Sequence, residues 1–90
     1  MKIKILGVEN SRRLELETNI RSTLKKLELP AKIQVVDLLD DILKHDITGI
    51  PAVIVNEKVM FQNGVPDKQK ILNYFQKIAQ QNASTLGMMK

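Results

Sequence analysis

The sequence predicts a small α/β domain in which a mixed β-sheet is flanked by helices. Short segments of alternating polar and apolar residues are typical of half-buried strands. Between them lie longer segments whose apolar residues recur every three or four positions, as in amphipathic helices. The length of 90 residues suits one domain. The resulting order of elements is β-α-β-α-β-β-α, and right-handed crossovers make this a four-stranded mixed sheet flanked by three helices.

The first half of the chain supplies two strands and two helices. Residues 2–6 and 32–36 alternate polar and apolar side chains, so both are expected to be strands. The helix between them is expected over residues 11–27, because four apolar residues share one face: Leu16, Ile20, Leu24 and Leu27. Asn10 or Ser11 is expected to be its N-cap. Asp37 is expected to cap a shorter helix with an apolar face of Leu38, Leu39, Ile42 and Leu43.

The second half supplies a hairpin and a last helix. Residues 52–55 are a β-branched run typical of a covered central strand, and residues 59–62 form its antiparallel partner. Pro66 and Asp67 open a helix whose inner stripe is Ile71, Tyr74, Phe75 and Ile78. Periodicity is lost from about Gln80, so we expect a domain over residues 1–79 and a flexible C-terminal tail over residues 80–90.

Composition excludes several kinds of chemistry. The chain has no cysteine, which rules out disulfides, thiolate catalysis and thiolate metal sites. The net charge is +4, but the basic residues are not interleaved with aromatic ones, so a nucleic-acid partner is not expected. No apolar run approaches the ~18 residues of a membrane span, and the N-terminus leads directly into a strand. A cytoplasmic location is therefore expected, with no membrane partner.

Four segments resemble a known family. Residues 2–7, 16–20, 49–56 and 59–66 are similar to the first strand, first helix, central strand and last strand of small thioredoxin-like proteins called redox-active disulfide protein 2. These proteins are close in size to glutaredoxins. The resemblance covers residues 2–79 and implies a thioredoxin-like fold.

The resemblance also locates a motif that this chain has lost. The family's Cys-x-x-Cys falls on Asn10-Ser11-Arg12-Arg13. Thiol–disulfide exchange needs one thiolate to attack and a second thiol to resolve the mixed disulfide, and neither an amide nor a guanidinium can do this. We therefore expect a redox-inactive domain with no catalytic residue and no cofactor. A Ser11–His45 nucleophilic pair is disfavoured, because a single loop histidine is more often a surface polar group.

The expected binding site is the former active-site groove, formed by Asn10, Ser11, Arg12, Arg13, Ile50 and Pro51. The resemblance implies that Pro51 follows a cis peptide bond and presents backbone groups to an extended peptide. The alternative is that this proline only shapes its loop. The two arginines could bind a small anion at the helix N-terminus, or they could point into solvent and pair with Glu9, Glu15 or Glu17.

Three functions stay open at this point. The first is a binding module for a peptide, a protein or a small anion. The second is a thiol–disulfide-related role in cell redox homeostasis that uses glutathione or the cysteines of a partner. The third is a structural or oligomerisation domain, in which Leu14 joins an apolar patch with Val8, Ile50 and Pro51. A metal site is not expected, because a helix cap and an exposed helix face account for the acidic residues near His45.

Overall fold

The predicted α/β fold is confirmed. The computed structural model describes residues 1–88, with side-chain surroundings for residues 1–81. The elements occur in the predicted order, with these bounds: β1 (Lys2–Leu6), α1 (Ser11–Lys26), β2 (Lys32–Val36), α2 (Leu39–Ile42), β3 (Ala52–Val55), β4 (Lys58–Phe61) and α3 (Lys68–Met88). Within the described part of the chain, no helix is long and apolar enough to cross a membrane.

The four strands form one mixed sheet in the order β2-β1-β3-β4. β1 and β2 are parallel, with Ile3 opposite Ile33. β1 and β3 are antiparallel, and the β3–β4 hairpin adds the second edge of the sheet. β1 is therefore central, and the loop that follows it opens at the carboxyl end of the two parallel strands, where α/β sheets commonly place their ligands.

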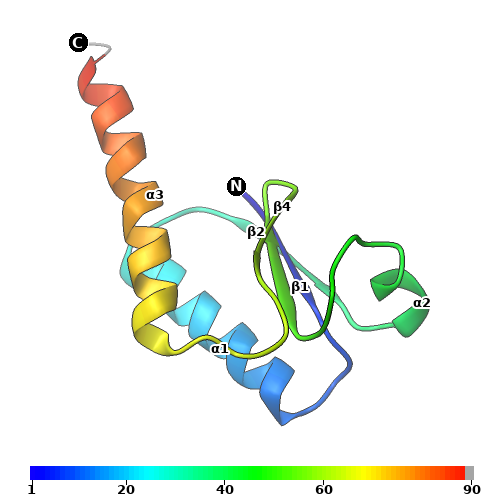
Figure 1. Cartoon of the computed structure of the whole chain (residues 1–90). Coiled ribbons are helices and arrows are strands. Elements are labelled where there is room, and N and C mark those ends of the chain that lie inside the picture. The colour runs from blue at the N-terminus through cyan, green and yellow to red at the C-terminus, as the bar shows by residue number, and fades with distance from the viewer. Residues whose placement is uncertain (89–90) are drawn as a thin grey trace.

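The main core lies between the sheet and the pair α1 and α3, which cover the same face (Figure 1). The predicted stripe of α1 is buried at Leu16, Ile20 and Leu24, and α3 contributes Ile71 and Phe75. Beside this core, the ring of Tyr74 packs between Phe61 and Phe75 at centroid distances of 5.8 and 5.0 Å. Burial raises the pKa of the Tyr74 phenol above its ordinary value.

On the opposite face of the sheet lies α2 (Figure 1), a single turn that buries only Ile42. The helix predicted here is wrong in two respects. Its N-cap is Leu38, with no side-chain cap, and Asp37 does not cap it. Of the four side chains expected on its apolar face, only Ile42 is buried, because a single turn directs only one of them onto the sheet. The other three are exposed: Leu38, Leu39 and Leu43.

α3 is longer than predicted. Asp67 caps it, since its Oδ1 accepts a hydrogen bond from the backbone N–H of Lys70 at 2.8 Å. The helix continues to Met88, well past Gln80. Loss of apolar periodicity did not end it, because residues 80–86 contain neither glycine nor proline. The domain boundary at residue 79 and the flexibility of the tail stay predictions, and residues 89–90 lie outside the described chain.

Candidate functional site

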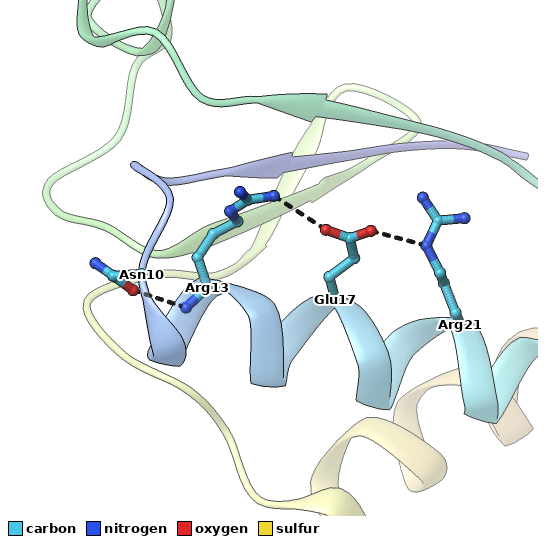
Figure 2. Close-up of polar contacts among 4 residues, drawn as sticks. All are labelled: Asn10, Arg13, Glu17 and Arg21. Carbon is cyan, nitrogen blue, oxygen red and sulfur yellow. Dashed lines mark hydrogen bonds and ion pairs between the residues drawn. The ribbon is translucent and has the colours of Figure 1, made fainter.

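Asn10, which the resemblance aligns with the first cysteine of the family's motif, is the N-cap of α1. Its backbone is extended (φ −157°, ψ 174°), and its Oδ1 accepts a hydrogen bond from the backbone N–H of Arg13 at 3.0 Å (Figure 2). Asparagine is among the best N-caps, and this bond satisfies one of the otherwise unpaired N–H groups of the first turn. The side chain that replaces the thiol therefore stabilises the helix.

Arg13, which the resemblance aligns with the second cysteine of the motif, is 5% exposed. Its side chain lies along α1 towards Glu17 and away from Asn10 (Figure 2). Its Nη1 donates to Glu17 Oε1 at 3.0 Å, and Glu17 Oε2 in turn accepts from Nε of Arg21 at 3.0 Å. Among the described residues, Arg13 Nε is a buried polar side-chain atom without a hydrogen-bond partner.

This arrangement explains how a cation is tolerated where the helix dipole opposes it. The first turn of α1 contains no acidic residue, so an arginine there is locally unfavourable. Glu17 lies one turn further along the helix and supplies the compensating charge. Of the alternatives set out from the sequence, Arg13 therefore adopts the ion pair, and its guanidinium is already engaged.

Gly7 is the point at which the three segments of the site meet. A Cβ atom on Gly7 would lie 2.8 Å from Cγ of Arg13 and 3.5 Å from Cβ of Pro51. The Gly7 N–H also donates to the carbonyl of Val36 at 3.0 Å, which extends the pairing of β1 with β2. Because Gly7 has no side chain, three segments can pack closely here: the loop after β1, the first turn of α1 and the loop before β3.

Replacing Gly7 with alanine should lower the free energy of unfolding by about 1–3 kcal/mol, since Arg13 Cγ is close to its own backbone and cannot move away freely. Urea denaturation of Gly7→Ala measures this. In an Arg13→Ala background the same substitution should cost less than about 1 kcal/mol, because the clashing atom is gone. An equal cost in both backgrounds would show that Arg13 does not fill this space.

Pro51 is buried, and the Ile50–Pro51 peptide bond is cis. The apolar patch expected from Val8, Leu14, Ile50 and Pro51 therefore lacks its proline side chain. The other three are exposed by 38%, 45% and 37% respectively, and they flank the point where Gly7 meets Arg13 and Pro51. We call these three residues, Val8, Leu14 and Ile50, the apolar rim.

The remaining two residues of the former motif, Ser11 and Arg12, are exposed. Nη2 of Arg12 would lie 3.7 Å from a Cβ on Gly64, so this side chain extends towards the loop before α3. The Arg13 side chain instead lies along α1 towards Glu17 (Figure 2). The two guanidinium groups thus extend in different directions and do not form the paired anion site considered from the sequence.

His45 is engaged elsewhere. Its Nδ1 lies 2.9 Å from the Asp41 carbonyl and its Nε2 lies 3.4 Å from Nζ of Lys4. The tautomer that satisfies both contacts donates from Nδ1 and accepts from the lysine at Nε2. Within residues 1–88, no group of three or more His, Cys, Asp or Glu side chains is arranged to hold a metal ion.

Sequence reasoning missed two residues of this site. Glu17 was considered only as one of several partners for the arginines, although the spacing Arg13, Glu17, Arg21 is the i, i+4 pattern of helical ion pairs. The sequence assigns Gly7 no packing role. Its role depends on the close approach of the residues around it, which no local pattern encodes.

The element order β-α-β-α-β-β-α, with the loop after β1 packed against the loop before β3 at Gly7 and Pro51, is that of a thioredoxin-like domain, and the sequence contains no cysteine. A family model described as the thioredoxin domain matches residues 1–76. The chain is also 30% identical over 71 residues to a thioredoxin of Methanothermobacter thermautotrophicus, an alignment that covers 79% of this chain and 92% of that protein. The protein belongs to the thioredoxin domain family.

Proposed function

We propose that this protein is a redox-inactive thioredoxin-family module that binds an extended peptide segment of a partner protein at the former active site. The observation that carries this proposal is the contrast between Arg13 and the residues around it. Arg13 is buried and paired with Glu17, whereas the apolar rim is exposed on the segments that meet at Gly7. Asn10 and Arg13 thus occupy the positions of the motif, and the apolar rim remains exposed for contact with a partner.

The chemistry of the residues favours a peptide over a small anion. A small anion would need cations with free donors, and the Arg13 guanidinium is already held by Glu17. Exposed apolar side chains on neighbouring segments suit a protein or peptide partner better than a small anion. Ser11 supplies a hydroxyl and Arg12 a cation beside this rim, which suits a segment that combines apolar and acidic side chains.

Two narrower statements belong to the same proposal. We infer kinship with the redox-active disulfide protein 2 group from the matching segments of sequence, and we propose a cytoplasmic location. A redox-linked role through glutathione or through a partner's cysteines is the rival to the binding module, and the experiment below separates the two.

Peptides selected against the native protein from a random library displayed on phage provide a probe, and fluorescence polarisation of the labelled peptide measures affinity. Leu14→Glu and Ile50→Glu should each weaken binding about tenfold or more, because each places a charge in an apolar contact. The matched control is Leu43→Glu, which alters an exposed leucine directly after α2 and should leave the affinity unchanged.

Glutathione, titrated into the native protein under the same conditions, should not compete with the selected peptide. Equal affinities of native protein, Leu14→Glu and Ile50→Glu would contradict the proposed site. Competition by glutathione, with turnover of a mixed disulfide in the presence of a glutathione reductase, would favour the redox-linked role instead.

A further inference from the structure

The face of the sheet that carries α2 is only half covered. At the carboxyl end of β1 this face is apolar and buried, with Leu6, Val36 and Ala52 beneath α2. At the other end it is basic: Lys2 lies opposite Lys32 in the register of β1 and β2, and Lys4 lies opposite Gln34. We call Lys2, Lys4 and Lys32 the lysine face. A hollow of about 610 Å³ lies over it, lined also by Ile54 and Glu57.

Next to this face lies a segment of opposite character. Residues 37–43, which we call the acidic-leucine segment, comprise α2 and its flanks. Leu38, Leu39 and Leu43 in it are exposed by 65%, 56% and 70%. Asp37 and Asp40 are exposed as well, while Asp41 pairs with Lys44 at 3.4 Å. Three large apolar side chains in seven residues exceed the scattered exposure that is ordinary for a monomer surface.

The acidic-leucine segment is held firmly on its own sheet. Ile42 is buried against the apolar half of the face, and His45 links the end of α2 to Lys4. The segment therefore cannot fold back onto the lysine face of its own chain. Its leucines and free carboxylates point to a surface outside the molecule.

We propose that the lysine face binds the acidic-leucine segment of a second copy of this chain, and that two copies pair in this way reciprocally. The charges are complementary: the exposed carboxylates of Asp37 and Asp40 would meet Lys2 and Lys32, and the leucines would cover Val59, next to the already buried Ile54. Val59 lies opposite Ile54 in the β3–β4 register and is 38% exposed.

The geometry permits a closed pair. Both surfaces lie on the same side of the sheet: α2 packs over Leu6 and Val36 at the carboxyl end of β1 and β2, and Lys2 and Lys32 begin these strands at the other end. A twofold axis that lies in the interface, at right angles to the strands, brings each segment over the partner's lysine face, so that both contacts form at once. A nucleic acid fits this face less well, because all three aromatic side chains of the protein, Phe61, Tyr74 and Phe75, pack on the other side of the sheet.

Sedimentation velocity of the full chain over a range of concentrations tests this pairing. The native protein should show a monomer–dimer equilibrium that weakens as salt is raised, because the exposed charges that join the copies are screened. Lys2→Glu with Lys32→Glu should raise the dissociation constant about tenfold or more, and Asp37→Lys with Asp40→Lys should do the same.

The decisive sample is an equimolar mixture of these two double variants. Each alone places like charges opposite one another, but in a mixed pair both contacts again join opposite charges, so dimers should return at native affinity. Circular dichroism of each variant verifies the fold, and Leu14→Glu, which alters the apolar rim, should leave the equilibrium unchanged. A native chain that stays monomeric at roughly millimolar concentration, open-ended oligomers, or variants that fail to rescue each other would overturn the proposal.

Discussion

Introducing cysteines with Asn10→Cys and Arg13→Cys together is expected to give the protein a disulfide reductase activity that the native chain lacks. The two positions are the N-cap and the third residue of α1, and the bond from Arg13 N–H to Asn10 Oδ1 shows that they adjoin. Side chains three residues apart on a helix have Cβ atoms about 5–6 Å apart, a spacing that small rotations bring within the range of a disulfide.

The first of these thiols would sit at a helix N-terminus, which lowers the pKa of a cysteine and raises its thiolate fraction. Reduction of insulin by dithiothreitol should therefore run about tenfold or more above the rate without protein. The native chain and the serine pair Asn10→Ser with Arg13→Ser should stay at that background, as should each single cysteine, because a lone thiol cannot resolve a mixed disulfide.

Removal of Arg13 costs its ion pair, but Glu17 keeps its contact with Arg21 and is partly exposed, so the double-cysteine variant is expected to fold. Thermal unfolding by circular dichroism checks this. A folded double-cysteine variant that forms its disulfide and still shows only background reduction would mean that the scaffold no longer presents a thiol to a substrate. In that case the loop would differ from a redox site in more than its two side chains.

The second large effect is expected at Glu17. Glu17→Leu should lower the free energy of unfolding by about 2–4 kcal/mol, because it leaves the Arg13 guanidinium buried without a counter-charge. Arg13 Nε already lacks a partner, which deepens the penalty. Arg13→Met removes the charge and keeps much of the volume, so this variant should lie within about 1 kcal/mol of the native protein or be more stable.

The double variant with both substitutions should recover most of the stability lost in Glu17→Leu, since no charge is then left buried. Arg21→Gln is the matched control: it removes the other, exposed partner of Glu17 and should cost less than about 0.5 kcal/mol. Urea denaturation gives all four values. Equal losses for Glu17→Leu and Arg21→Gln would mean that the Arg13 charge reaches water in solution.

Much of the fold could be predicted from the sequence because the spacing of apolar residues matches the faces that the helices and strands bury. The stripe Leu16, Ile20 and Leu24 is buried as its spacing indicates, and β1 and β2 alternate as the two faces of the sheet require. α2 could not be predicted in this way. Its leucines have the spacing of a buried face, but the helix is one turn long, and nothing in the local pattern records that length.

The site shows a similar division. The N-cap role of Asn10 follows from residue type and position alone. The buried state of Arg13 does not, because an arginine beside a helix N-terminus is ordinarily expected in solvent. It depends on Gly7 leaving room for Cγ and on Glu17 accepting the far end of the side chain, and these contacts join three positions that sequence reasoning treats separately.

The most direct test of the proposed binding module is an amide chemical-shift map of the native protein titrated with a phage-selected peptide. The largest changes in amide chemical shift should fall on residues 7–14 and 49–52. The shifts of Gly7, Leu14 and Ile50 should give the same dissociation constant when plotted against peptide concentration. Residues of α2 serve as the internal reference and should stay in place. Shifts confined to α2 and the lysine face, with residues 7–14 unmoved, would contradict the account.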